Sequence, residues 1–280
     1  MVKQIQYEVI AFYMFVGIDD CESFAPTLKA QMLELDVMGT ILLADEGING
    51  TISGTPESIE KIVEIIRAHD GLGELTYKSS FAPAHVFNRA KVKVKPEIIN
   101  IGAPVDPTRT VGQYVKPDEW NKVISDPEVV LIDTRNDYEV YAGTFDGAVD
   151  PHIKRFRDLP AFVENHYNPK IHKKIAMFCT GGIRCEKSTA YMLEHGFEHV
   201  FHLEGGILKY LEEIPQSESM WKGDCYVFDE RVGVNHDLEP SDNAKFCPGC
   251  GHALTTKLRC APEYVAGERC SFCPEVRAGV

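Results

Sequence analysis

Apolar and polar positions in the first hundred residues repeat with two different periods. The N-terminal stretch MVKQIQYEVIAFYMFV alternates apolar with polar residues, which predicts a first strand rather than a signal peptide. Residues 20–36 instead repeat apolar residues at helical spacing. The residues on that side of the predicted helix are Phe24, Leu28, Met32 and Leu35.

The rest of this region continues the alternation of strands and helices. Residues 38–44 and 47–54 predict two short strands around the turn DEGING, and the later strands lie within 74–80 and 90–99. Residues 55–71 predict a helix with Thr55 at its N-cap, Pro56 at its first position and Gly71 at its end. The order β-α-β-β-α-β predicts a ferredoxin-like sandwich over residues 1–99, in which two helices cover one face of an antiparallel sheet.

Residues 100–117 are rich in Pro, Gly and Thr and predict a linker, after which the pattern changes. Buried strands are predicted at EVVLIDTR and KKIAMFCTGG, a helix at CEKSTAYMLEHGF, and a third strand followed by a helix in HVFHLEGGILKYLEEIP. Strands that alternate with helices predict a parallel α/β domain over residues 118–217, so the fold class of the chain combines α+β and α/β. Ligands of such sheets bind beyond the carboxyl ends of the strands, and Cys179 stands at such an end.

Residues 218–280 are polar and rich in cysteine. Two CxxC pairs, Cys247 with Cys250 and Cys270 with Cys273, are separated by 19 residues, which predicts a small zinc-ribbon-like module with one structural zinc ion. His252 and Cys260 are additional potential ligands. Two redox pairs, or free thiols, are the alternative interpretation.

Composition and charge narrow the classes of protein that fit. A chain of 280 residues with 44% hydrophobic and 25% charged residues is typical of globular domains. No apolar run approaches the ~20 residues of a membrane helix, so we expect no membrane partner. Nine cysteines without an export signal favour a reducing compartment, and we expect the cytoplasm. The net charge of −13 argues against broad nucleic-acid binding but leaves room for a local basic groove.

The loop CTGGIRC combines features that activate a thiol. A thiol at Cys179 would lie between a strand end and a helix N-terminus, where backbone N–H groups favour the thiolate. Gly181 and Gly182 let the chain curl into an anion-binding loop, and Arg184 adds a positive charge. Because its neighbours are too small to shield it, we expect the thiol to be presented to solvent. The alternative is a buried structural cysteine beside a tight turn.

Three stretches, VVLIDTRNDYEVYAGTFDGAVD, MFCTGGIRCEKSTAYM and VFHLEGGI, resemble the rhodanese domain. The resemblance implies that Cys179 carries a persulfide and that Asp133, Arg135 and Glu139 support the loop, although Asp133 and Arg135 could equally form an ordinary ion pair. Phosphatases of the same fold separate the cysteine and the arginine by five residues. Only four residues separate Cys179 from Arg184, which argues against phosphatase activity.

A wider resemblance extends over nearly the whole chain. The strings FCTGGIRCEKS, LLADEGINGTISG, FNRAKVKVKPEII and HLEGGILKYLEEIP resemble the rhodanese-domain tRNA uridine hydroxylases of the TrhO type. That family implies hydroxylation of the wobble uridine of tRNA to 5-hydroxyuridine, with O2 as co-substrate. We find no signature of an organic cofactor. A general sulfurtransferase and a non-enzymatic redox or adaptor module are the alternatives.

Cys185 distinguishes this loop from that of a plain rhodanese, where a small hydroxyl residue is more usual. We therefore place Cys179, Arg184 and Cys185 in the catalytic set, and count Lys187 with the glycines of the loop among the supporting residues. A thiolate could add to C6 of uracil, or a persulfide on Cys179 could be the activated group with Cys185 resolving it. The sequence does not decide between these two mechanisms.

The wobble base lies in an unpaired loop, so its recognition should use stacking and phosphate contacts. Two-residue alternation places Lys91, Lys93 and Lys95 on one face of a strand, and Arg89 continues that face. We expect this face to bind the anticodon loop of tRNA. A solvated sheet edge protected by lysines is the alternative.

Overall fold

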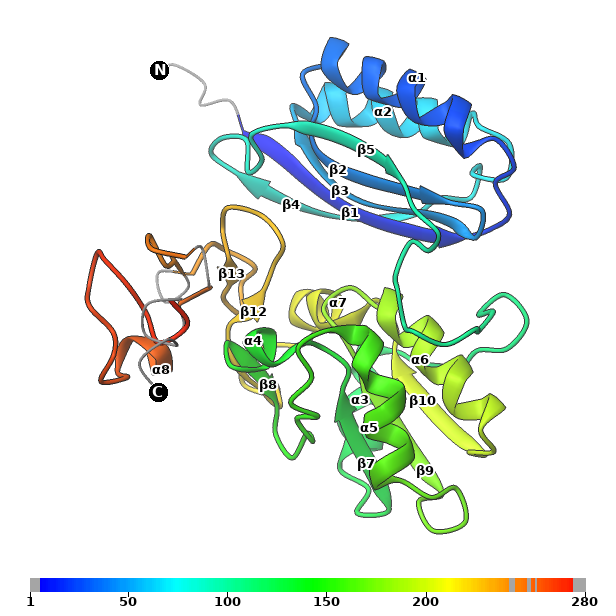
Figure 1. Cartoon of the computed structure of the whole chain (residues 1–280), viewed down its shortest axis with the longest axis vertical. Helices are drawn as coiled ribbons and strands as arrows, with labels where there is room; N and C mark the ends of the chain where they lie inside the picture. The colour runs from blue at the N-terminus through cyan, green and yellow to red at the C-terminus, as the bar shows by residue number, and fades with distance from the viewer. Residues whose placement is uncertain (1–5, 242–244, 251–252, 255, 274–280) are drawn as a thin grey trace. The chain divides into compact units, whose positions relative to one another are not determined.

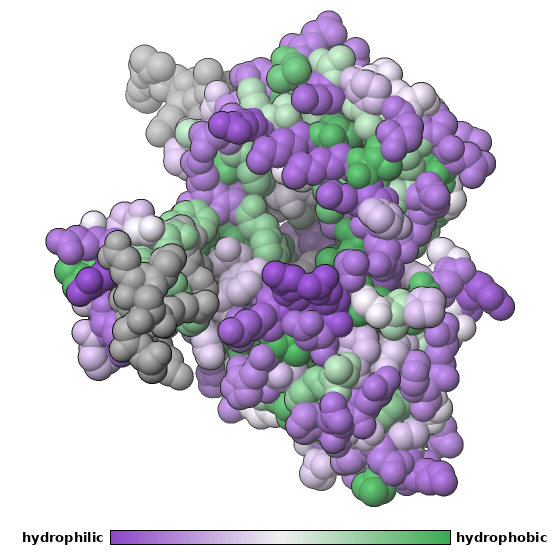
Figure 2. Space-filling view, viewed as in Figure 1, coloured by the Kyte–Doolittle hydropathy of each residue, from purple (hydrophilic) through white to green (hydrophobic). Residues whose placement is uncertain are grey.

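A computed structural model describes residues 6–241, 245–250, 253–254 and 256–273 of the chain. It divides into two compact units, Met1–Asn100 and Ile101–Val280. Hydrophilic side chains predominate on the visible surface of each unit (Figure 2). Among the described residues, no helix is both long and apolar enough to cross a membrane.

The first unit has the predicted ferredoxin-like order with one additional strand. Its elements are β1 (Tyr7–Phe15), α1 (Cys21–Glu34), β2 (Met38–Ala44), β3 (Gly47–Gly54), α2 (Pro56–Arg67), β4 (Tyr77–Ala82) and β5 (Ala90–Val94). The sheet order is β4-β1-β3-β2-β5, and β5 pairs with β2 in parallel. The sheet is therefore mixed and not purely antiparallel. Alternation identifies a strand, but its partner and direction depend on tertiary contacts.

Helices α1 and α2 lie on the same face of this sheet (Figure 1). Their apolar sides pack on alternate strand residues such as Ile10, Phe12, Ile41 and Ile52, which are all nearly inaccessible to solvent. Thr55 caps α2 as predicted, because its side chain accepts a hydrogen bond from the N–H of Ser58. The even-numbered positions of β1 thus supply the core of this unit.

The second unit contains the predicted rhodanese-like parallel sheet. Its strands are β6 (Gln113–Val115), β7 (Val129–Asp133), β9 (Lys174–Phe178) and β10 (His199–Leu203), in the order β6-β10-β9-β7. All three pairings are parallel. The accompanying helices are α3 (Pro117–Ile124), α4 (Asp137–Val140), α5 (Leu159–His166), α6 (Ile183–Glu194) and α7 (Gly206–Glu213).

Two short segments differ from the pattern that the sequence predicted. The end of the predicted linker, residues 113–115, forms the edge strand β6, which is too short to show a period. The predicted C-terminal module begins within the core of the second unit, because Trp221, Cys225 and Val234 pack there. These residues lie on β11 (Trp221–Gly223), β12 (Cys225–Tyr226) and β13 (Gly233–Val234).

Five further short elements belong to the described part of the second unit. Strand β8 (Gly143–Phe145) pairs antiparallel with β11 and thereby connects the α/β core to the chain that follows it. Strands β14 (Lys245–Phe246) and β15 (Ala253–Leu254) form an antiparallel pair, and α8 covers Thr256–Arg259. A single 3-10 turn, Phe156–Asp158, leads directly into α5.

Candidate active site around Cys179

Cys179 follows β9 directly and is completely buried, with 0% of its surface exposed. The expectation of a presented thiol is therefore wrong. The start of α7 closes the site: the N–H groups of Ile207 and Leu208 donate to the carbonyls of Cys179 and Thr180 at 3.0 and 3.1 Å. A Cβ atom on Gly206 would lie 2.5 Å from the Cys179 carbonyl oxygen, so only glycine allows this close approach.

The two glycines of the loop have different roles. Gly182 has a φ of 104° and precedes the first residue of α6, and its N–H donates to the Cys179 sulfur at 3.1 Å. A glycine is required there because other residues rarely adopt that backbone conformation. A Cβ atom on Gly181 would have no atom within 4 Å, so the chain is open at that position. The loop therefore directs a donor at the sulfur and leaves room beside it.

The pKa of the Cys179 thiol is lowered to about 5. Burial by itself would raise this pKa, because it penalises the charged form. A hydrogen bond with the Cys185 thiol, the positive charge of Arg184 and the backbone N–H groups of Arg184 and Cys185 outweigh burial. Cys179 is thus a thiolate at neutral pH, although solvent does not reach it.

Arg184 is fixed by a two-point ion pair with Glu139. Its terminal nitrogens lie 2.7 Å from the two carboxylate oxygens, and both side chains are buried. Burial alone would raise the pKa of Glu139, but Arg184 and then Arg135 lower it below its ordinary value. One nitrogen of Arg184 also lies 3.3 Å from the Thr180 hydroxyl. The guanidinium therefore has a single position beside the loop.

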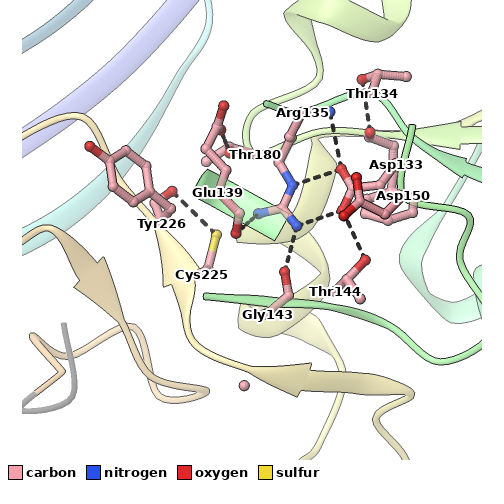
Figure 3. A network of polar contacts seen from close by, with 12 residues as sticks. Asp133, Thr134, Arg135, Glu139, Gly143, Thr144, Asp150, Thr180, Cys225 and Tyr226 are labelled. Carbon is pink, nitrogen blue, oxygen red and sulfur yellow. Dashed lines mark hydrogen bonds and ion pairs between the residues drawn. The ribbon is translucent and has the colours of Figure 1, made fainter. Parts of the chain in front are cut away.

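Asp133 and Arg135 form a second buried ion pair (Figure 3). Arg135 donates to both oxygens of Asp133 at 2.9 and 2.6 Å, and to the carbonyls of Gly143 at 2.6 Å and Glu139 at 3.3 Å. The Thr144 hydroxyl donates to Asp133 at 2.8 Å. This ion pair connects β7, α4 and β8 and so positions Glu139, which in turn holds Arg184.

Cys185 lies in the first turn of α6 and is also completely buried. Its pKa is raised well above the ordinary value by burial and by its hydrogen bond to the Cys179 thiolate. Its sulfur lies 4.0 Å from the Thr134 hydroxyl, which donates to the Phe178 carbonyl at 2.9 Å. Cys185 is thus a protonated thiol that donates to Cys179. Lys187, on the same helix, is 1% exposed.

Several residues of this site were not predicted. Thr134 and Thr180 stand next to predicted residues, so the motifs could have included them. Cys225 lies beside Arg135 and Glu139 (Figure 3). Burial raises the pKa of its thiol to about 12, so it is a neutral group there. It comes from β12, and no local signal connects that strand with the loop.

The predicted RNA-binding residues lie in the first unit. Lys91 and Lys93 are exposed on β5, which is an edge strand of its sheet. Lys95 follows the strand, is exposed, and its N–H donates to the Leu43 carbonyl. Arg89 precedes the strand, and its carbonyl accepts from the N–H of Gly39. RNA binding by these residues remains a prediction.

The four predicted metal ligands form a compact cluster. The sulfur atoms of Cys247, Cys250, Cys270 and Cys273 all lie within 4.8 Å of one another. The pairs Cys247–Cys273 and Cys250–Cys270 are 3.7 and 3.6 Å apart, close to the ~3.8 Å between thiolates bound to one tetrahedral zinc ion. Four cysteines therefore fit zinc. His252 lies outside the described residues, and Cys260 is exposed and outside the cluster.

Comparison with protein families matches both units. Residues 7–98 match the model of the UPF0176 acylphosphatase-like domain, and residues 116–213 match the model of the rhodanese-like domain. The chain therefore has the domain architecture of the TrhO/UPF0176 family. The second match places Cys179 in a rhodanese-like domain, as the loop motif implied.

Solved structures also show similarity to the chain. The rhodanese-like domain of an Anabaena protein is 17% identical, with a TM-score of 0.33 over 41% of this chain and 80% of that chain. A rhodanese-related protein from Thermoplasma volcanium is 17% identical, with a TM-score of 0.28 over 36% and 92%. A possible tyrosine phosphatase from Rhodopseudomonas palustris is 18% identical, with a TM-score of 0.28 over 38% and 83%. Because these TM-scores are below 0.5, we draw no conclusion from them.

The pKa of Cys179 leads to the first testable prediction. Thiolate absorbance at 240 nm, taken as the difference between the wild type and Cys179→Ser, should appear as the pH rises through about 5 and stay constant to pH 8. Arg184→Met removes a positive charge from beside the sulfur, so the midpoint should move to higher pH. A midpoint near 9 in the wild type would contradict the stabilisation described above.

The cysteine cluster leads to the second prediction. Purified protein should contain about one zinc ion per chain, measured by elemental analysis. Cys247→Ser or Cys270→Ser should reduce this content, because each removes one of four ligands. Cys260→Ser is the matched control, since its thiol is exposed and lies outside the cluster. Zinc-free protein with four free thiols at these positions would refute the assignment.

Proposed function

We propose that this protein hydroxylates the wobble uridine of tRNA to 5-hydroxyuridine with O2, and that Cys179 is the reacting thiol. The observation that carries the proposal is a pair of completely buried, hydrogen-bonded cysteines, in which the Cys179 sulfur also accepts from the Gly182 N–H at 3.1 Å and has a lowered pKa. A plain sulfur carrier needs only the first thiol. The domain architecture of the TrhO/UPF0176 family supports the proposal.

Hydroxylation at C5 of uracil requires C5 to become electron-rich. A thiolate that adds to C6 forms a C–S bond and moves the electrons of the C5–C6 double bond toward O4, which yields an enolate. Cys179 can add without transferring a proton first, because it is already a thiolate at neutral pH. C5 then bonds to O2 as a peroxide, and two electrons cleave the O–O bond to leave a hydroxyl group on C5 and release water. Loss of the proton on C5 and departure of the thiolate restore the double bond.

The enolate oxygen needs hydrogen-bond donors. Both terminal nitrogens of Arg184 already donate to Glu139, so we assign to Arg184 the stabilisation of negative charge at a distance. The N–H of Gly182 donates to the Cys179 thiolate in the resting site. When the sulfur forms a bond to carbon it loses its charge, so this loop becomes available to a new anion.

The reduction of the second oxygen atom of O2 gives Cys185 a role. O2 supplies one oxygen atom to uridine, and two electrons must reduce the other atom to water. Two thiols provide those electrons when they form a disulfide: uridine, O2 and two thiols give 5-hydroxyuridine, water and one disulfide. Cys185 is hydrogen-bonded to Cys179 and is therefore the partner we assign. An external thiol must reduce the disulfide before the next turnover.

A general sulfurtransferase is the second candidate, favoured by the match to the rhodanese-like domain. In that reaction the Cys179 thiolate accepts the outer sulfur of thiosulfate, releases sulfite and passes the sulfur to a nucleophile. Thiocyanate formed from thiosulfate and cyanide measures this activity. It does not require Cys185, so Cys185→Ser distinguishes the two candidates: it should abolish hydroxylation and leave sulfur transfer intact.

The third prediction concerns tRNA in the cell. Deletion of the gene should remove 5-hydroxyuridine from tRNA, as measured by mass spectrometry of nucleosides. Expression of the wild type should restore it, and Cys179→Ser should not, because the hydroxyl of serine is not ionised at neutral pH. Cys21→Ala, a buried cysteine of the other unit, is the control and should restore the modification. Full restoration by Cys179→Ser would refute the proposal.

A further inference from the structure

The sheet of the first unit has two faces of different composition. Residues that point toward α1 and α2 are buried, as Ile10, Phe12 and Leu43 show. The opposite face, which we call the open face, is not covered by either helix (Figure 1). It includes ten partly or fully exposed residues: Ala11, Tyr13, Phe15, Thr40, Leu42, Asn49, Thr51, Lys78, Lys91 and Lys93.

Strand register places these residues side by side. One row across the sheet runs from Tyr13 on β1 through Asn49 on β3 and Leu42 on β2 to Lys93 on β5. The adjacent row contains Lys78 on β4, paired with Ala11 on β1, and ends at Lys91 on β5. Paired residues project from the same face of a sheet, so the ten side chains share one surface.

The open face ends near the start of β1. Val9 belongs to the same face, but it packs with Ala82, Val86 and Phe87 from the segment after β4 and is 2% exposed. This apolar cluster closes the face toward the start of β1. The rest of the face is partly or fully exposed and carries the two aromatic residues of β1. Within it, the Asn49 amide donates to the carbonyl of the buried residue Ile98 at 3.0 Å, so the chain that follows β5 contacts the face at that point.

Tyr13 and Phe15 stand two residues apart on a central strand of the sheet. Their ring centroids are 6.2 Å apart with an interplanar angle of 67°. The Lys78 ammonium lies 5.7 Å from the centre of the Tyr13 ring. Aromatic rings on an exposed sheet, with cations beside them, match the arrangement that single-stranded nucleic acids use for base stacking and phosphate contact.

The charge of the open face is opposite to that of the chain. The chain has 42 acidic and 29 basic residues, yet the ten residues include three lysines and no carboxylate. The lysines occupy both edges of the sheet, β4 and β5, with the aromatic, threonine and asparagine side chains between them. An anionic chain that crosses the sheet would thus meet a cation on each side.

We propose that the open face binds single-stranded RNA, with Tyr13 and Phe15 stacking on unpaired bases and Lys78, Lys91 and Lys93 contacting phosphates. This inference rests on the proposed function only for its natural ligand, the anticodon loop of tRNA. It assigns base stacking to two aromatic residues and a phosphate contact to a third strand, neither of which the lysine pattern of β5 predicted.

The test uses the full chain and a fluorescent single-stranded oligouridine, with the same strand in a duplex as the comparison. Fluorescence anisotropy should show tighter binding of the single strand. Tyr13→Ala and Phe15→Ala should each weaken it on the order of tenfold, and Tyr13→Phe should bind like the wild type because stacking needs only the ring. Lys91→Glu with Lys93→Glu should lower the slope of log K against log salt by at least about 1.4.

Matched controls lie on the helix side of the same unit. Phe81 is 48% exposed on β4 and pairs with Glu8, so Phe81→Ala removes an exposed aromatic ring from the other face. Lys29→Glu reverses an exposed charge on α1. Both variants should bind like the wild type. Equal losses in these controls, or unchanged binding in Tyr13→Ala and Phe15→Ala, would overturn the proposal.

The two proposals can fail separately. If Tyr13→Ala does not fold, the exposed lysine pair still tests the surface, and unchanged affinity and salt slope in that variant would refute it. RNA binding through Tyr13 and Phe15, without any effect of gene deletion on 5-hydroxyuridine, would refute the proposed function. It would leave the proposal that the open face binds RNA standing. Loss of 5-hydroxyuridine on deletion, together with unchanged RNA binding in the variants, would refute the proposal that the open face binds RNA and would leave the proposed function standing.

Discussion

Arginine side chains are costly to bury unless each charge is paired, and this chain buries Arg184 beside the Cys179 thiolate and Arg135 beside Glu139. Arg184 meets Glu139 at two points, and Arg135 meets Asp133 in the same way. Removing one member of such a pair typically costs about 3–5 kcal/mol, because it leaves an uncompensated charge. The position of the whole loop therefore depends on Glu139, which is held from one side by Arg135 and holds Arg184 on the other.

Cys179 and Cys185 are both thiols, but their surroundings give them different protonation states. Both are completely buried, which by itself raises both pKa values. The Gly182 N–H, the start of α6 and Arg184 favour a negative charge on Cys179, and that charge in turn keeps the proton on Cys185. Neighbouring groups whose pKa values are pushed apart in this way can take different roles, and we assign Cys179 as the nucleophile and Cys185 as its disulfide partner.

The sequence predicted those features that are encoded locally. Alternation and caps identified the ferredoxin-like unit, the alternation of strands with helices identified the parallel sheet, and the motif around Cys179 identified the glycine loop. The burial of Cys179 could not be predicted in this way, because α7 closes the loop from more than twenty residues away and Gly206 resembles any other glycine in a turn. The position of Cys225 could not be predicted for the same reason, because β12 is far from the loop in the sequence. The parallel pairing of β5 could not be predicted either, because it depends on which edge of the sheet is available.

Covalent trapping can detect the proposed addition of the Cys179 thiolate to C6 of uridine. An anticodon stem-loop with 5-fluorouridine at the wobble position should form a stable adduct without O2, because fluorine withdraws electrons and favours addition at C6. After nuclease and protease digestion, mass spectrometry should find the fluorinated nucleotide on the peptide that contains Cys179, and Cys179→Ser should show none. An adduct on Cys185 instead, or a persulfide on Cys179 with no nucleotide attached, would contradict this account.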